Sequence, residues 1–246
     1  TRLRLARERR VRRPVMSVAE ELKLLEVAPV HLKRIIITAL DTGMRRGEIL
    51  NQRWEHLDMQ RKVLSVSRSK TPEGEAREIP LTGRLYELLN QDYRKAGLVF
   101  TYKDQPITFT IKTSWGAALK NAGLRHYRFH DLRHTHNTRL MEAGVMQEIR
   151  MALMGHSNRD RVHATYTHVE LPVKRAAIAK LEAWVADQIQ TIGGQNDSSQ
   201  IERPNNQGNN NAGGLDRNSV EETVEEENTG ADPARSGGQT PRGDHP

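Results

Sequence analysis

The segment 191–246 sets the first limit on what this chain can fold into, because it contains no phenylalanine, tryptophan or tyrosine. It holds nine of the chain's 18 glycines, and its ten acidic residues and four arginines give a formal charge of −6. Such a segment cannot bury enough apolar surface to offset the entropy lost on ordering. We therefore expect 191–246 to be a disordered, acidic-leaning tail, so any folded core must come from residues 1–190.

The rest of the chain is strongly basic. Residues 1–190 carry 34 lysines and arginines against 21 acidic residues, a formal charge of +13. A body of this charge is typical of a protein that binds a polyanion, although a solvated basic surface is the ordinary alternative. Residues 1–14 contain seven arginines and one acidic residue, and we interpret them as a basic linker.

The chain has no cysteine, which excludes disulfides, thiolate metal sites and cysteine nucleophiles. No apolar run approaches the roughly 20 residues that a membrane-spanning helix needs, so we expect no membrane partner. A cysteine-free chain is compatible with a reducing compartment, and we expect a cytoplasmic protein.

Helical periodicity dominates residues 15–190. Ser17 and Glu20 form the S-x-x-E pattern of a capping box, which predicts a helix that starts there. Gly43 marks the end of a second, apolar helix. The predicted helices cover residues 17–25, 31–40, 45–52, 84–96, 108–122, 131–143, 147–154 and 173–190.

The hydrophobic period changes between residues 63 and 81. Residues 63–67 and 78–81 have the pattern of two strands, joined by a turn at 71–74 that contains proline and glycine. Residues 98–100 could add a third strand. The predicted fold is therefore α+β and mainly α, a helical domain with a small antiparallel β-sheet over residues 15–190.

Residues 42–48, Thr-Gly-Met-Arg-Arg-Gly-Glu, place Arg45 where a helix begins. Backbone N–H groups and the helix dipole favour an anion at such a position, and an arginine adds to that preference. Glu48 lies one helical turn later and could orient an arginine. The plain structural alternative is a surface helix start with an i,i+3 ion pair.

Residues 130–134, His-Asp-Leu-Arg-His, put His130 and Arg133 on one helix face, so both can reach one substrate group. His130 and His134 also have the i,i+4 spacing of metal ligands on a helix. A zinc hydrolase would need a glutamate where Asp131 stands and further ligands downstream, so we expect no metal here.

Three further residues have ordinary interpretations when each is taken singly. Lys70, in Ser-Lys-Thr, would sit at the tip of the predicted hairpin, where lysines are usually just exposed. His156 follows Gly155, which could simply end a helix. Tyr166, in Ala-Thr-Tyr-Thr-His, would more often be a packing residue than a nucleophile.

Taken in order, these candidates share one chemistry. Two arginines can neutralise the nonbridging oxygens of a phosphodiester. A tyrosine hydroxyl can attack phosphorus and keep a phosphoester bond, and a lysine can protonate a departing 5′ oxygen. The candidate catalytic residues are Arg45, Lys70, His130, Arg133, His156 and Tyr166.

The order T-G-x-R-x-x-E, strand lysine, H-x-L-R-H-T, G-H-S and Y-T-H resembles the catalytic domain of the tyrosine recombinases, particularly the phage-type integrases. The resemblance covers roughly residues 15–190. It implies that Arg45 and Arg133 clamp the scissile phosphate and that Glu48 is structural.

The resemblance implies roles for the other four candidates as well. Lys70 would be the general acid for the 5′-hydroxyl, and His130 would assist proton transfer. His156 would hydrogen-bond the phosphate, and Tyr166 would attack it to form a 3′-phosphotyrosine. The interval from His156 to Tyr166 is ten residues, one more than the family pattern implies, and Tyr127 is the nearest rival nucleophile.

By this resemblance the protein is a site-specific recombinase of a mobile genetic element, acting on double-stranded DNA as a homotetramer at the nucleoid. It would need no metal, nucleotide or other cofactor, and it would have no small-molecule substrate. Residues 1–14 would be the linker from a missing N-terminal DNA-binding domain. Three alternatives stay open: a DNA-binding fragment without independent catalysis, a metal-dependent hydrolase, and a type IB topoisomerase-like enzyme.

Overall fold

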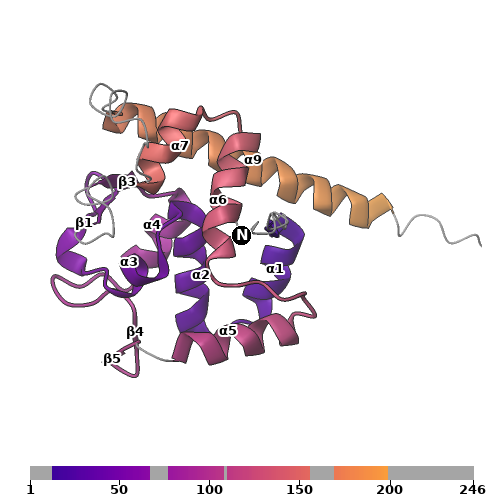
Figure 1. Cartoon of the computed structure of the whole chain (residues 1–246), viewed down its shortest axis with the longest axis horizontal. Coiled ribbons are helices and arrows are strands. Elements are labelled where there is room, and N and C mark those ends of the chain that lie inside the picture. Colours follow the sequence, from indigo (N-terminus) through magenta and orange to yellow (C-terminus); the bar gives the residue numbers. More distant parts are fainter. Residues whose placement is uncertain (1–12, 67–76, 108–109, 156–168, 199–246) are drawn as a thin grey trace, which may run out of the picture. The chain divides into compact units, whose positions relative to one another are not determined.

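Two helices, α2 and α6, pack against each other at the centre of the fold (Figure 1). This arrangement is that of a computed structural model, which describes residues 13–66, 77–107, 110–155 and 169–198. Three candidate residues lie outside the described residues: Lys70, His156 and Tyr166. Both chain ends, residues 1–12 and 199–246, lie outside them too.

The fold is α+β and mainly helical, as predicted. The helices of the described chain are α1 (Val18–Val27), α2 (Val30–Thr42), α3 (Arg46–Leu50), the short 3-10 helix η1 (Trp54–His56), α4 (Gly83–Asn90), α5 (Thr110–Asn121), α6 (Asp131–Glu142), α7 (Gln147–Met154) and α9 (Leu171–Ser198). The strands are β1 (Leu57–Asp58), β2 (Val63–Ser65), β3 (Glu78–Pro80), β4 (Thr101–Tyr102) and β5 (Gln105–Pro106).

The capping box predicted at the start of α1 is confirmed. The Ser17 hydroxyl accepts a hydrogen bond from the backbone N–H of Glu20 at 3.2 Å, and the Glu20 carboxylate accepts one from the N–H of Ser17 at 2.8 Å. These two bonds satisfy backbone donors that a helix start leaves unpaired. They fix α1 in a position where its next turn can reach α6.

A buried ion pair joins α1 to α6. Arg139 of α6 donates to the Glu21 carboxylate at 2.5 Å and to the carbonyl oxygen of Met16 at 3.2 Å. Both charged side chains are almost fully buried. Because a buried charge is costly without a partner, each residue requires the other.

The end of α2 approaches α6 very closely. Gly43 adopts a left-handed conformation with φ of 62°, and a Cβ atom built on it would lie 2.5 Å from Cδ2 of His136. The His136 ring is buried, with Nδ1 2.7 Å from the carbonyl oxygen of Leu40. Burial lowers the pKa of His136 to about 4, so the ring is neutral at pH 7 and Nδ1 donates to that carbonyl.

The three-stranded sheet has the order β1-β2-β3 and is antiparallel throughout. The predicted pairing of the two strands around the turn is confirmed, with Leu64 opposite Ile79 and Ser65 opposite Glu78. Both Leu64 and Ile79 face the core. The backbone N–H of Val66 also bonds the carbonyl of Arg77 at 3.1 Å, which closes the base of the segment that carries Lys70.

The interpretation of residues 98–100 as a third strand of this sheet is wrong, because β1 takes that place. Leu98 forms an isolated bridge with Arg53, and the N–H of Val99 donates to the carbonyl of Gln52 at 2.9 Å. The apolar run is explained by burial, since Val99 and Phe100 both lie in the core. A separate hairpin, β4 with β5, follows it and was not predicted.

The long helix α9 crosses the helical body (Figure 1) and contacts α1, α6, α7 and β3. Its apolar stripe begins on the chain's own core, where Ile178 and Leu181 are each 2% exposed, and ends with Ile189 at 42% exposed. The helix continues to Ser198. Residues 191–198, expected to belong to a disordered tail, are therefore helical, since a helix needs no aromatic residues to extend from a packed base.

None of the described helices combines the length and the apolar composition that crossing a membrane requires. All of the described residues belong to one compact unit.

Replacing Gly43 with alanine should destabilise the fold by on the order of 3 kcal/mol, because the residue has positive φ and its Cβ would overlap the His136 ring. Urea unfolding followed by circular dichroism measures the change. Gly116→Ala is the matched control: Gly116 lies in α5 with no atom within 4 Å of an added Cβ, so alanine should stabilise the helix by up to about 1 kcal/mol. Equal effects of the two substitutions would contradict this explanation.

Candidate active site

Arg45 stands at the N-cap of α3 and is held there by Glu48. The Glu48 carboxylate accepts hydrogen bonds from the backbone N–H of Arg45 and from its guanidinium, both at 2.8 Å. This is the i,i+3 pair expected from the sequence, but it is not a surface pair, because the Glu48 side chain is 4% exposed. The Arg45 guanidinium also donates to the carbonyl oxygen of Gly155 at 3.4 Å.

Arg133 lies on α6 and is buried. Its guanidinium donates to the carbonyl oxygen of Gly43 at 2.5 Å and to that of Met154 at 2.6 Å. The left-handed turn at Gly43 directs one of these carbonyls toward α6, and the C-terminal end of α7 supplies the other. Arg133 is therefore held by backbone from two elements that are far apart in sequence.

A third arginine, Arg77, was missed by the sequence reasoning. It immediately precedes β3, and its guanidinium bonds the Glu48 carboxylate at 2.7 Å and the carbonyl oxygen of Leu153 at 3.1 Å. Its side chain is 3% exposed. A lone arginine before an apolar strand carries no sequence signal of this role, because its partners are 29 and 76 residues away.

The three arginines meet at the C-terminal end of α7. Arg77, Arg133 and Arg45 donate to three successive carbonyls, those of residues 153, 154 and 155. The last carbonyls of a helix have no intrahelical donor and form the negative end of its dipole. The end of α7 thus provides acceptors for three cations, of which Arg77 and Arg133 are buried and Arg45 is partly exposed.

Among the described residues of the cluster, three arginines surround one carboxylate. Burial, followed by the charges of Arg45 and Arg77, lowers the pKa of Arg133 to about 9, while Glu48 opposes that change. The pKa of Glu48 is lowered to about 2 although burial by itself raises it, because hydrogen bonds and charge from Arg77 and Arg45 outweigh the burial. A bound anion would relieve the remaining repulsion between the arginines.

His130 stands beside the same cluster, at the N-cap of α6 and three residues before Arg133. Its pKa is lowered, first by partial desolvation of the ring and then by the nearby charges of Arg133, Arg13 and Arg45. The lowered pKa favours the neutral imidazole, which can accept a proton at one ring nitrogen and donate a hydrogen bond from the other. The structure thus brings together Arg45, His130 and Arg133 of the six candidates.

Two segments outside the described residues, 67–76 and 156–168, carry the other candidates. Each is joined in the chain to a residue of this cluster, Arg77 or Gly155. Residues 67–76, which include Lys70, run between Val66 and Arg77. His156 is the next residue after Gly155, whose carbonyl accepts from Arg45. The segment with Tyr166 leads into α9, where Lys174 donates to the carbonyl of Glu78 at 3.3 Å, next to Arg77 in sequence.

Tyr127, the rival nucleophile, is fully buried, and its hydroxyl contacts α1. Its hydroxyl bonds the Glu20 carboxylate at 2.9 Å and receives a hydrogen bond from Arg125 at 2.9 Å. Burial raises the pKa of Tyr127. A phenol that is enclosed, protonated and engaged with a capping carboxylate is poorly suited to attack DNA.

The metal alternative for His130 and His134 gains no ligands from the described part of the chain. There, no three His, Asp or Glu side chains gather closely enough to hold a metal ion. Such a site would need ligands from residues outside the described ranges.

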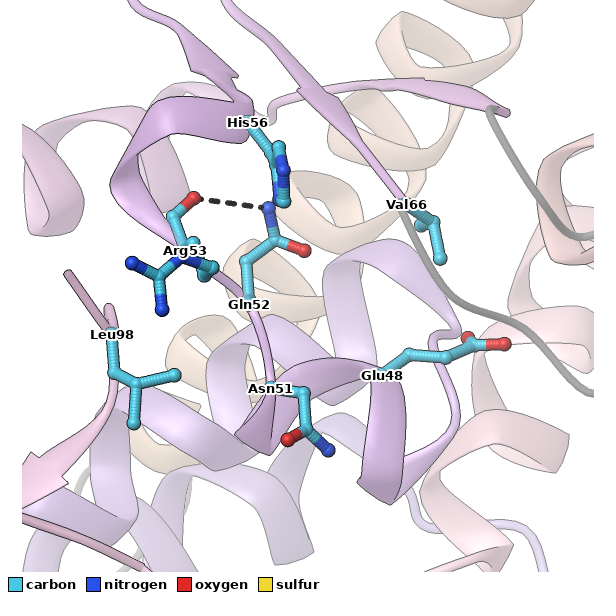
Figure 2. Close-up of a pocket in the computed structure, with 7 residues that line it drawn as sticks. All are labelled: Glu48, Asn51, Gln52, Arg53, His56, Val66 and Leu98. Atoms are coloured by element: carbon cyan, nitrogen blue, oxygen red, sulfur yellow. Dashed lines mark hydrogen bonds between the residues drawn. The ribbon is translucent and has the colours of Figure 1, made fainter. Parts of the chain in front are cut away.

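A cavity of about 440 Å³ borders the cluster on one side. Figure 2 shows Glu48 at one end of it and Leu98 at the other, with His56, Gln52 and Val66 between them. The side-chain amide of Gln52 donates to the carbonyl of Ser65 at 3.3 Å, and so ties this wall to β2. Of the described cluster residues, Glu48 lines the cavity, together with Val66, the last described residue before 67–76.

The chain matches the phage integrase family over residues 13–171. It is 30% identical over 164 residues to the integrase of Salmonella phage P22, a match that covers 61% of this chain and 42% of the phage protein. It is 29% identical over 194 residues to the shufflon-specific DNA recombinase of Escherichia coli, covering 71% and 49%. The chain thus spans about half the length of these two curated relatives.

The fold resembles the solved integrase from mycobacterium phage Brujita, with a TM-score of 0.59 and 27% sequence identity. The match covers 76% of this chain and 66% of that one.

Replacing Glu48 with glutamine should destabilise the protein by on the order of 3 kcal/mol at about pH 7, because it removes the ionised carboxylate that buried Arg77 bonds. The pKa of Glu48 lies near 2 in the folded state against an ordinary 4.5. Its carboxylate therefore stabilises the fold above about pH 4.5 and loses this effect as the pH falls toward 2. The difference between wild type and variant in urea unfolding should shrink on acidification.

The matched control for this pH series is Glu87→Gln, since Glu87 is an exposed residue of α4. Its unfolding free energy should stay within about 0.5 kcal/mol of wild type at every pH. A Glu48→Gln deficit that does not change between about pH 7 and about pH 3 would contradict the role of the ionised carboxylate.

Proposed function

This chain belongs to the phage integrase family, and we propose that it is a site-specific DNA recombinase that cuts and rejoins DNA strands through a 3′-phosphotyrosine intermediate. The catalytic residues of this proposal are Arg45, Lys70, His130, Arg133, His156 and Tyr166. The names of its relatives, an integrase and a DNA recombinase, agree with this reaction class.

The observation that carries the proposal is the gathering of Arg45 and Arg133 at the end of α7, next to a neutral His130. Their excess positive charge suits a phosphodiester, whose two nonbridging oxygens an arginine fork can bind. Such donors stabilise the charge that builds up on the phosphate during attack, and they need little rearrangement. A solvated surface arginine would offer neither property.

The proposed reaction proceeds in two transesterifications. The Tyr166 hydroxyl attacks phosphorus and gives up its proton, the P–O bond to the 5′ oxygen breaks, and Lys70 protonates that oxygen. His130 assists the proton transfers, and His156 donates a hydrogen bond to the phosphate. A 5′-hydroxyl from the partner duplex then attacks the phosphotyrosine and releases Tyr166, so the number of phosphoester bonds is conserved without a nucleotide cofactor.

We assign double-stranded DNA as the substrate and a homotetramer on DNA as the working assembly, inside the cytoplasm at the nucleoid. Residues 1–190, with a formal charge of +13, suit binding through phosphates, so affinity should fall steeply with salt. In this proposal residues 15–190 and the continuation of α9 to Ser198 form the catalytic domain, residues 1–14 are a basic linker, and the remaining residues are an acidic-leaning tail.

Replacing Tyr166 with phenylalanine should abolish covalent attachment to DNA while duplex binding persists, because the variant loses the attacking oxygen and keeps the arginines. The assay is a denaturing gel with a labelled duplex that carries a nick near the cleavage site, so that the cut end is trapped. Tyr127→Phe is the matched control. It removes a hydroxyl bonded to Glu20 and should lower stability by about 1 kcal/mol, yet it should still form the adduct.

The same gel separates the alternatives. A DNA-binding fragment without catalysis would give no adduct with any variant, and a metal-dependent hydrolase would cut without an adduct and would stop with a chelator. An adduct formed by Tyr166→Phe and lost in Tyr127→Phe would move the nucleophile to Tyr127. Relaxation of supercoiled DNA without strand exchange between duplexes would favour the topoisomerase-like enzyme.

Arg133→Lys should slow adduct formation by about 100-fold or more, because lysine cannot hold two backbone carbonyls and a phosphate oxygen with one planar fork. DNA affinity should change much less, since the positive charge remains. Quenched-flow or manual time courses of the trapped adduct measure the rate constant. A variant that cleaves within threefold of wild type would show that Arg133 is not part of the phosphate clamp.

A further inference from the structure

Arg77 bonds the same groups that hold the two proposed phosphate-binding arginines, and like Arg133, which is 4% exposed, it is buried. Its side chain is 3% exposed, whereas that of Arg45 is 21% exposed. Its guanidinium bonds Glu48 and the carbonyl of Leu153. Arg77 thus bonds two groups that also hold the site together, Glu48 and the end of α7, while the Arg45 side chain keeps some access to solvent.

The first support is the Glu48 carboxylate. Arg77 contacts both of its oxygens, Oε2 at 2.7 Å and Oε1 at 3.5 Å. Arg45 bonds the same carboxylate, with its guanidinium at Oε1 and its backbone N–H at Oε2. Because the Glu48 carboxylate also bonds the buried, planar guanidinium of Arg77, it has little freedom to rotate. The direction of the Arg45 guanidinium therefore depends on Arg77.

The second support is the C-terminal end of α7. The Leu153 carbonyl oxygen accepts a hydrogen bond from Nε of Arg77 at 3.1 Å. The next carbonyl oxygen, that of Met154, accepts one from the Arg133 guanidinium at 2.6 Å. Because successive carbonyls of one helix end move together, fixing the first also fixes the others. Arg77 therefore acts on the supports of both proposed phosphate-binding arginines at once.

We propose that Arg77 is a positioning residue of the active site: it holds Glu48 and the end of α7 in the relative position that aims Arg45 and Arg133 at one phosphate. This inference rests on the proposed strand-cleavage function. The residue does not touch the phosphate itself. Its contribution is made through the geometry of the other two arginines, where a displacement of about 1 Å can cost a factor of about 100 in rate.

Arginine is the side chain that this position requires. Its planar group presents Nε to one partner and Nη1 and Nη2 to another in fixed directions, while lysine carries the same charge on a single rotatable atom. Arg77→Lys therefore keeps the counter-charge of buried Glu48 and loses one of the two directed contacts. Arg77→Met removes the charge as well and leaves Glu48 without its buried partner.

Arg139 provides a matched control on the face of α6 that meets α1. It too is a buried arginine that bonds one carboxylate, Glu21, and one backbone carbonyl, that of Met16. Its partners belong to α1 and the residues before it, away from Arg45 and the end of α7. Arg139→Lys thus reproduces the chemical change of Arg77→Lys at a place where no proposed phosphate contact depends on it.

The test measures single-turnover adduct formation on the nicked duplex with excess full-length protein, and thermal unfolding of each variant. The final amount of adduct reports the folded, competent fraction, and the rate constant reports how well that fraction stabilises the reacting phosphate. For Arg77→Lys we expect a rate constant reduced about tenfold or more with an amplitude close to wild type. For Arg139→Lys we expect a lower melting temperature and an unchanged rate constant.

Each result bears on either the proposed function or the role of Arg77. No adduct from wild-type protein would overturn the proposed function and with it the basis of this inference. A wild-type adduct together with an unchanged rate constant in Arg77→Lys would overturn the inference alone. So would an equal slowing by Arg139→Lys, or a failure of Arg77→Lys and Arg77→Met to fold, because Arg77 would then be a residue of the core.

Discussion

The site depends on how the end of α7 and the Glu48 carboxylate hold three arginines in one small region. Three successive carbonyls, those of residues 153–155, each receive a different guanidinium. Glu48 compensates part of the charge, which is why its pKa falls to about 2 despite burial. Three arginines surround this one carboxylate among the described residues, and burial followed by the charges of Arg45 and Arg77 lowers the pKa of Arg133 to about 9. The folded protein therefore maintains a directed excess of positive charge, which is the physical requirement for binding an anion at one place.

The rest of the described fold serves to bring the parts of this cluster together. α2 ends in the left-handed turn at Gly43, which gives one carbonyl to Arg133. The neutral His136 ring fills the space under that turn and bonds Leu40, so the end of α2 and the start of α6 keep one separation. α9 also contacts this region, because the Lys174 side chain donates to the carbonyl oxygen of Glu78 in the strand that follows Arg77. Changes in any of these contacts would be transmitted to the arginines.

The comparison with known proteins and the geometry support the same chemistry by different routes. Family membership supports the proposed reaction class, and the cluster supplies positive charge that would suit a phosphodiester. Tyr127 illustrates what the structure adds: its hydroxyl is bonded to Glu20 on the α1 side of the domain, so it cannot serve the arginines. Lys70, His156 and Tyr166 lie outside the described residues, in segments joined in the chain to Val66, Arg77 and Gly155.

Local patterns in the sequence were enough to predict the features that depend on residues close together in the chain. The capping box at Ser17, the helix end at Gly43, the pairing of β2 with β3 and the i,i+3 pair of Arg45 and Glu48 all involve short separations. Tertiary structure decided what depends on distant residues or on burial. Residues 98–100 are apolar because the core covers them, α9 continues past residue 190 from a packed base, and Arg77 gains its role from partners 29 and 76 residues away. Periodicity describes one element at a time, whereas the convergence of three arginines on the end of α7 exists only after the elements have packed.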